Sequence, residues 1–168
     1  KGWNDPDMLV IGMNGITPTM GKTHMTMWCM MNSPLMLGLD LRKVQKGDDN
    51  WNIITNTDAI ALNQDPLGIQ AKRIYSSVIS NNPDTSYTEI SNRVDILAKP
   101  LANGDVALSF INLKKSDDSK TYSVDVDKII SFIGDKMVNK EQFENAEAYV
   151  VKDVWTKGTT HNTDGVFS

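Results

Sequence analysis

Two carboxylates near the start of the chain are the side chains whose type and spacing are best suited to chemistry. Asp5 and Asp7 flank Pro6 in the run Asn4-Asp5-Pro6-Asp7-Met8. A carboxylate here can accept hydrogen bonds from the hydroxyl groups of a ligand and place negative potential beside a developing positive charge. Asp, Asn and Pro are also turn-forming residues in their own right. From residue types alone, a simple turn is the favoured interpretation.

The other candidates for catalysis or metal binding are few. His24 falls on the apolar side of a predicted helix, which is typical of a core or interface histidine, and His161 is expected in a polar surface loop. Cys29 is the single cysteine, so no intrachain disulfide is possible. Two distant histidines and one cysteine lack metal-ligand spacing, and a solvated loop is favoured over a calcium site at Asp117-Asp118. We predict no metal and no other cofactor.

Length and composition limit the class of protein. The chain has 168 residues, of which 40% are hydrophobic, and a formal net charge of -4. This length can bury a core in one domain or two small ones. The mild acidity argues against a nucleic-acid partner, since phosphate neutralisation needs clustered Lys and Arg. No apolar run approaches the roughly twenty residues needed to span a bilayer, so no membrane role is expected, and the sequence does not indicate a compartment.

Residues 1–70 have the periodicity of helices around a buried strand. Thr17 and Pro18 predict a helix start, and helix is expected over 19–31, over 49–56 and in a short turn through Asn63. The apolar run 35–38 is typical of a strand buried on both faces. The order predicts alternating strands and helices around a parallel sheet. The predicted apolar stripe of the first helix comprises Met20, His24, Met27, Trp28 and Met31.

The remaining residues predict short antiparallel strands. Strands over 94–99 and 106–111 flank Asn103-Gly104, a favoured type I′ turn pair. Further strands are expected over 122–126 and 149–155, whereas 128–133 is ambiguous and could be a helical turn. The pattern favours an antiparallel β-sandwich. Pro66 and Gly68 place the boundary between the two halves near residue 70.

Several segments in register resemble one enzyme family. The run Gly2-Trp3-Asn4-Asp5-Pro6-Asp7-Met8-Leu9, the helix-then-strand segment from Thr23 to Arg42, and Asn63-Gln64-Asp65-Pro66-Leu67-Gly68 are similar to segments of α-galactosidases and α-N-acetylgalactosaminidases (glycoside hydrolase family 27, clan D). Residues 103–112 and 151–155 are similar to the carboxy-terminal β domain of that family. The resemblance extends over nearly the whole chain.

The resemblance implies a fold class of α/β plus all-β. Residues 1–70 would form the last two β/α units of a (β/α)8 barrel, and 71–168 an antiparallel β-sandwich domain whose last strand is missing. It implies a retaining glycosidase acting on terminal α-D-galactosyl residues, with two carboxylates about 5–5.5 Å apart. Asp7 and Met8 match family residues that line the galactose site, at the carboxy end of a barrel strand. Trp3 is expected in the core, and Asp5 is interpreted as structural.

The chain departs from the family in one important way. The Lys-Tyr-Asp motif that carries the nucleophile and the motif that carries the acid/base Asp are both absent. We therefore expect no catalytic residue in this chain, and we expect the chain to be cut at both ends. Its expected partners are the α-galactoside substrate and the rest of the same enzyme, and an oligomer is possible. One alternative is a non-catalytic sandwich or buttress module. The others are an α-N-acetylgalactosaminidase and a β-L-arabinopyranosidase of the same family, because the residues that distinguish the sugars of these enzymes lie upstream.

Overall fold

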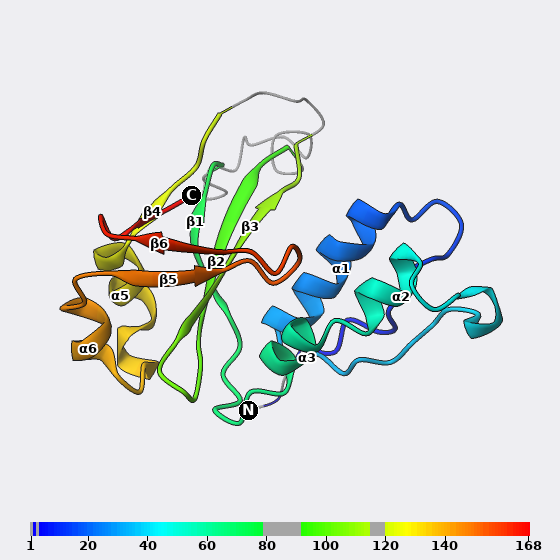
Figure 1. Ribbon diagram of the computed structural model, residues 1–168, viewed down its shortest axis with the longest axis horizontal. Coiled ribbons are helices and arrows are strands. Elements are labelled where there is room, and N and C mark those ends of the chain that lie inside the picture. Colours follow the sequence, from blue (N-terminus) through cyan, green and yellow to red (C-terminus); the bar gives the residue numbers. More distant parts are fainter. Residues whose placement is uncertain (1, 3, 79–91, 115–119) are drawn as a thin grey trace. The chain divides into compact units, whose positions relative to one another are not determined.

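The computed structural model describes residues 2, 4–78, 92–114 and 120–168. The chain divides into two compact units, which are coloured along the sequence in Figure 1. The first, here called the helical unit, comprises Lys1–Gln70 and Val154–Lys157. The second, the strand-rich unit, comprises Ala71–Asp153 and Gly158–Ser168. The predictions for Trp3 and for Asp117-Asp118 lie outside the described residues.

Three helices of the helical unit begin at polar caps. Helix α1 spans Pro18–Met30, α2 Asp49–Ile54 and α3 Thr57–Asn63, and the 3-10 turn η1 covers Leu41–Lys43. The predicted start of α1 is confirmed: Thr17 Oγ1 accepts a hydrogen bond from the Met20 N–H, and Pro18 occupies the first turn. Helix α3 is capped by Asn56, whose Oδ1 accepts from two backbone N–H groups of its first turn.

The buried face of α1 is rotated by about one residue from the predicted stripe. Gly21, Met25, Cys29 and Met30 are buried, whereas Met20 is 49% exposed. The helix is apolar over much of its surface, so periodicity alone does not identify which face is covered. The core of the helical unit forms from Leu9, Ile11, Met25, Cys29, Ile53 and Ala59.

One parallel backbone contact joins two extended segments of the helical unit. Leu9 pairs with Leu37 in a parallel bridge, in which the Leu9 N–H donates to the Met36 carbonyl at 2.7 Å and the Gly38 N–H to the Leu9 carbonyl at 2.8 Å. The predicted buried strand over 35–38 is thus reduced to a single bridge, and both Met36 and Leu37 are exposed. Neighbouring parallel strands would be needed to extend this pairing into a sheet.

His24 of α1 is satisfied by the same extended segment. Its Nε2 accepts a hydrogen bond from the Val10 N–H at 3.0 Å, so the proton of the neutral ring resides on Nδ1. The His24 ring also meets the Trp28 ring edge-on, with centroids 4.0 Å apart. Partial burial lowers the pKa of His24 below 6.5. These contacts agree with the prediction of a core or interface histidine.

Asn56 joins α3 to a segment almost a hundred residues away. Its Nδ2 donates to the Val154 carbonyl at 3.0 Å, and its Oδ1 accepts from the Lys157 Nζ at 2.8 Å. Lys157 also forms an ion pair with Asp58 at 2.7 Å, and the Trp155 Nε1 donates to the Thr26 Oγ1 at 3.2 Å. The residues 154–157 are therefore part of the helical unit, although they lie within the stretch predicted to be all β.

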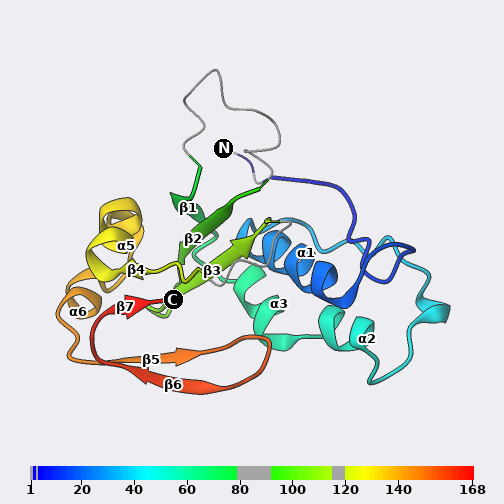
Figure 2. The same ribbon diagram turned by 90° about the horizontal axis from the view of Figure 1, so that it is seen from above.

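Antiparallel strands dominate the strand-rich unit, as predicted. Strands β1 (Lys72–Ser76), β2 (Val94–Pro100) and β3 (Val106–Asn112) form a three-stranded sheet in that order. Two further pairs are β4 (Val124–Asp125) with β7 (Val166–Phe167), and β5 (Tyr149–Lys152) with β6 (Thr159–Asn162). Figure 2 shows β1 to β3 side by side and β5–β6 as a separate hairpin. These sheets agree with a C-terminal β domain.

Two local predictions in the strand-rich unit are wrong. The connection between β2 and β3 is not a type I′ turn, because Gly104 has φ +93° whereas Asn103 is not in the left-handed region that this turn requires. Instead the Gly104 N–H donates to the Leu101 carbonyl at 3.0 Å and a longer five-residue connection results. The strand expected over 122–126 is only two residues long, since Asp125 caps helix α5 through the Lys128 N–H.

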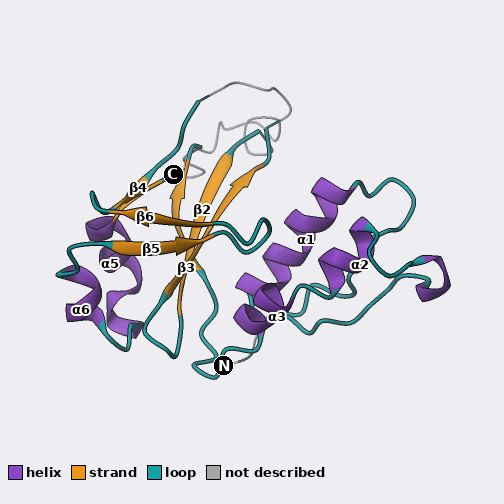
Figure 3. Ribbon diagram, viewed as in Figure 1, coloured by secondary structure: helices purple, strands orange, loops and turns teal. Residues whose placement is uncertain are grey.

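Helices cover the core of the strand-rich unit. Helix α5 (Val126–Ile133) buries Ile129 and Ile133 against Ile74, Ile96 and Ala98 of the sheet, so the ambiguous stretch 128–133 is helical. The 3-10 turn η2 (Gly134–Lys136) and helix α6 (Lys140–Glu144) follow, and Figure 3 shows these helices together beside the strands. In the described parts of the chain, none of the helices has the length and apolar character to cross a bilayer.

Replacing Asn56 by Ala is expected to lower the free energy of unfolding of the helical unit by about 2–3 kcal/mol. The variant loses the cap of α3 and leaves the carbonyl of the half-buried Val154 without the Asn56 donor. Chemical denaturation measures the change. Asn52→Ala is the matched control, because Asn52 is exposed and its side chain donates to the nearby Gly47 carbonyl within the same region of the chain. Equal losses in both variants would contradict the assignment.

Acidification below pH 6.5 is expected to destabilise the helical unit through His24. Its folded-state pKa is lowered, so the unfolded state takes up a proton first and stability falls as the pH drops from 6.5. Protonation at Nε2 also removes the acceptor for the Val10 N–H. Unfolding curves from pH 8 to pH 5 should show a flatter profile for His24→Gln than for the wild type. His161→Gln, in exposed strand β6, should retain the wild-type slope.

Candidate functional site

Asp7 adopts a backbone conformation that few non-glycine residues occupy. Its φ is +75°, in the left-handed region, and its side chain is exposed. This conformation costs roughly 1–2 kcal/mol for an L-residue, although Asp tolerates it better than most. Such outliers persist where surrounding contacts determine them, and they cluster at functional sites. The conformation therefore marks residue 7 as a place to look for function.

Two hydrogen bonds offset the energetic cost of the left-handed conformation of Asp7. The Trp28 Nε1 donates to the Asp7 carbonyl at 3.0 Å, and the Asp7 Oδ1 accepts from the Met8 N–H at 2.9 Å. A typical net contribution is about 1 kcal/mol per hydrogen bond, so the two together match the strain. On the preceding side, the Asn4 Nδ2 donates to the Gln70 Oε1 at 3.2 Å. The run is thus held at Asn4 through its side chain and at Asp7 and Met8 through backbone groups, while the side chains of Asp7 and Met8 stay exposed.

Met8 lies against a position where only a glycine fits. A Cβ atom on Gly38 would be 2.9 Å from the Met8 Cβ and 3.3 Å from the Leu9 carbonyl oxygen. The Met8 side chain is nevertheless 49% exposed, so it presents a thioether surface beside the Asp7 carboxylate. The two predicted site residues are therefore adjacent and exposed, one supplying acceptors and the other an adaptable apolar surface. This combination suits a ligand with both hydroxyl groups and an apolar face.

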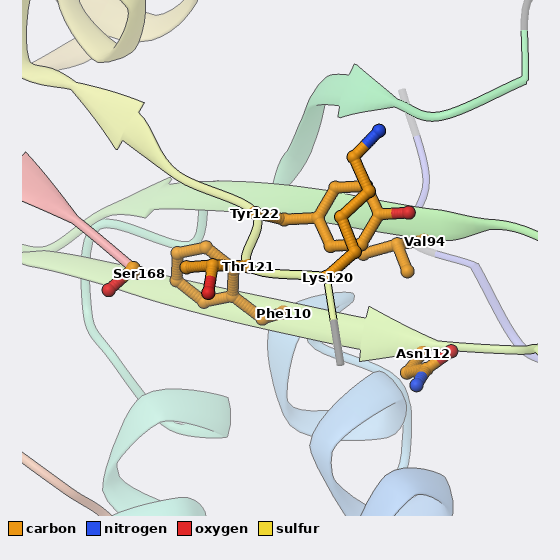
Figure 4. A pocket seen from close by; sticks show the side chains of 7 residues that line it. All are labelled: Val94, Phe110, Asn112, Lys120, Thr121, Tyr122 and Ser168. Carbon is orange, nitrogen blue, oxygen red and sulfur yellow. The ribbon is translucent and has the colours of Figure 1, made fainter. Parts of the chain in front are cut away.

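A hollow of about 240 Å³ lies on the strand-rich unit, and neither Asp7 nor Met8 lines it. Figure 4 shows Phe110, Asn112, Lys120 and Tyr122 around it. Sugar-binding faces use open aromatic rings, but the Tyr122 ring is already approached by the ammonium groups of Lys114 and Lys120, at 5.3 and 5.5 Å from its centroid. The alternative of a carbohydrate-binding sandwich therefore gains no support from this hollow.

A second hollow, of about 430 Å³, lies within the helical unit. It is lined by ends of α2 and α3, Lys22 of α1 and the segment of Trp155 and Lys157. Lys157 is paired with Asp58, and Trp155 with Thr26, so the polar groups serve the fold. Asp7 and Met8 line neither hollow.

Among the described residues, no group of three or more His, Cys, Asp or Glu side chains could hold a metal ion.

The other polar residues singled out in the sequence have structural surroundings. Asn63 is buried at the end of α3, and its Nδ2 donates to the Trp28 and Ser33 carbonyls at 3.2 and 2.9 Å, so its side chain joins α3 to the end of α1. His161 is exposed as expected, but in strand β6 and not in a loop. Sequence reasoning missed the contribution of Trp28 to the backbone of Asp7. Its four-residue spacing from His24 was the available signal.

Two family models match the chain in succession. Residues 1–65 match the model described as alpha galactosidase A, and residues 91–168 match the model of the alpha galactosidase C-terminal beta sandwich domain. Both the helical unit and the strand-rich unit therefore have a counterpart in the same family of enzymes, in the order expected from the resemblance.

Individual relatives extend these matches. Alpha-galactosidase A from Cellvibrio japonicus is 32% identical over 166 residues, 99% of this chain and 36% of the relative. Alpha-galactosidase from Cyamopsis tetragonoloba is 34% identical over 122 residues, 73% of this chain and 26% of the relative. The solved alpha-galactosidase of Saccharomyces cerevisiae has a TM-score of 0.70 and 25% identity, covering 92% of this chain and 31% of that one. The chain thus spans only about a quarter to a third of these proteins.

The solved alpha-galactosidase I of Mortierella vinacea has a TM-score of 0.68 and 25% identity. The alignment covers 99% of this chain and 35% of the Mortierella vinacea chain. The family models follow one another in chain order, and the Cellvibrio japonicus relative is 32% identical over 99% of the chain. The chain therefore belongs to the α-galactosidase family, glycoside hydrolase family 27.

Proposed function

We propose that this chain is part of a retaining glycoside hydrolase that releases terminal α-D-galactosyl residues from oligosaccharides or glycoconjugates. The observation that carries the proposal is the match of both halves of the chain, in order, to α-galactosidase family models. A second solved structure of the Saccharomyces cerevisiae enzyme, with 25% identity and a TM-score of 0.70, contains raffinose. That agrees with an oligosaccharide as the substrate class.

In this proposal, residues 1–70 are the last two β/α units of a (β/α)8 barrel and 71–168 form the β-sandwich domain. The parallel bridge between Leu9 and Leu37, with α1 between the two segments in sequence, is the connection that a β/α unit makes. Met36 is 62% exposed and Leu37 41% exposed. In the proposed enzyme, the other strands and helices of the barrel cover these apolar side chains and pair with the open backbone edges.

The proposed role of Asp7 and Met8 is to bind the sugar. Asp7 stands immediately before the bridged segment, with an exposed carboxylate that can accept hydrogen bonds from sugar hydroxyls. Its negative charge also favours an oxocarbenium-like transition state. Met8 offers an apolar surface to the carbon face of the hexose. The nucleophile and the acid/base carboxylate are supplied by parts of the barrel outside this chain, so these 168 residues alone perform no hydrolysis.

The direct test is hydrolysis of a chromogenic α-galactoside. The polypeptide that contains this chain together with the rest of the barrel should be active, whereas this chain alone should release no product. Asp7→Gly should lower kcat/KM by roughly thirtyfold, since a charge-assisted hydrogen bond contributes about 2 kcal/mol. It should not lower stability, because glycine adopts the left-handed conformation freely.

The matched control is Asp5→Asn in the same run, for which kcat/KM should change less than twofold. If Asp7 serves only a turn, Asp7→Gly retains full activity, and the substrate-binding role is wrong. If the complete polypeptide is active on neither α-galactosides nor the α-N-acetylgalactosaminide and β-L-arabinopyranoside analogues, the enzymatic proposal itself is wrong.

Gly38→Ala should raise KM several-fold through Met8. The added methyl group would sit 2.9 Å from the Met8 Cβ, so the Met8 side chain has to move out of its observed place. Steady-state kinetics on the same α-galactoside measure the change. Gly2→Ala is the control, because a Cβ there meets no atom within 4 Å. An unchanged KM in Gly38→Ala would show that the position of Met8 does not matter for substrate binding.

A further inference from the structure

We propose that Trp28 and His24, on one side of helix α1, are positioning residues of the substrate site. They touch no reacting group. They hold the backbone on both sides of Met8, and so fix the directions in which the Asp7 carboxylate and the Met8 thioether point. This inference rests on the proposed sugar-binding role of Asp7 and Met8.

The two aromatic side chains contact the backbone at either end of a four-residue stretch. The Trp28 Nε1 donates to the Asp7 carbonyl at 3.0 Å, and the His24 Nε2 accepts from the Val10 N–H at 3.0 Å. Their rings meet edge-on, with centroids 4.0 Å apart, so each ring restricts the orientation of the other. Residues four apart on a helix lie on the same side, which lets one helix present both groups.

A second set of hydrogen bonds fixes the residue in the middle of that stretch. The Leu9 N–H donates to the Met36 carbonyl, and the Leu9 carbonyl accepts from the Gly38 N–H. Leu9 itself is 1% exposed. The backbone from Asp7 to Val10 is therefore bound by helix α1 and by residues 36–38, which leaves little freedom for Met8 between them.

The left-handed conformation makes Asp7 sensitive to the loss of the Trp28 bond. With φ at +75°, the residue relaxes towards the common extended or helical regions when the contacts that determine it are removed. Such a rotation would redirect its carboxylate even though Trp28 is not in contact with the ligand. Helix α1 thus contributes to substrate affinity through the backbone conformation of Asp7.

Trp28→Phe tests the inference in the complete polypeptide. Phenylalanine keeps a ring against His24 but lacks the donor for the Asp7 carbonyl. We expect KM for a chromogenic α-galactoside and the inhibition constant of free galactose to rise about fivefold or more. We expect kcat to fall as well, because the proposed Asp7 charge also favours the transition state. The matched control is Trp155→Phe, which removes another indole donor to the same helix, at Thr26, and should leave both constants unchanged.

His24 supplies the second arm of the test. His24→Leu removes the acceptor for the Val10 N–H and should weaken galactose binding, whereas His24→Gln, whose amide oxygen can accept, should restore most of it. Hydrogen exchange of the Val10 amide should speed up in His24→Leu and not in His24→Gln. Suppose that the wild type is active. If KM and galactose inhibition are then unchanged in Trp28→Phe, or change equally in Trp155→Phe, the positioning role alone is wrong. A wild type that neither cleaves nor binds galactosides overturns the proposed function as well.

Discussion

The backbone between Asp7 and Val10 is the constraint on which the candidate site depends. Residues 36–38 hold it through two hydrogen bonds to Leu9, and helix α1 holds it through ring nitrogen atoms at the two ends. Backbone groups that are bound in this way cannot hydrate or rotate freely. The side chains of Asp7 and Met8 can then remain exposed and still be well placed, which is what a preformed binding surface requires.

Several features of the fold were predictable because local chemistry determines them. Thr17 and Pro18 start α1 as expected, since a hydroxyl cap and a proline at the first turn both act within one turn of helix. The antiparallel pairing of β2 with β3 was expected because two apolar segments lie on either side of one short turn-forming segment. The turn between them was not predictable from Asn103-Gly104 alone, because the register from Pro100 to Val106 leaves five residues to connect, too many for a two-residue turn.

The features that sequence reasoning missed depend on contacts between distant residues. The buried face of α1 is set by Ile11 and Ile53, which pack beside Gly21, and not by the periodicity of its own methionines. Likewise, Val154 and Lys157 belong to the helical unit because Asn56, almost a hundred residues earlier, binds both. A local pattern of β-branched residues contains no information about such a partner.

The candidate site also combines features that the sequence predicted with features that depend on contacts between distant residues. Asp7 and Met8 came from a resemblance over a short run, and the residue types alone favoured a turn. What raises Asp7 above a turn residue is its left-handed φ combined with an indole donor from a helix some twenty residues away. Asp7 shares with turn residues a side chain that accepts from the next backbone N–H, and the indole donor from α1 is support beyond that local bond. Support from α1 is expected where a strained residue has a use that outweighs its cost in stability, and in the proposed enzyme that use is to present one carboxylate to a sugar.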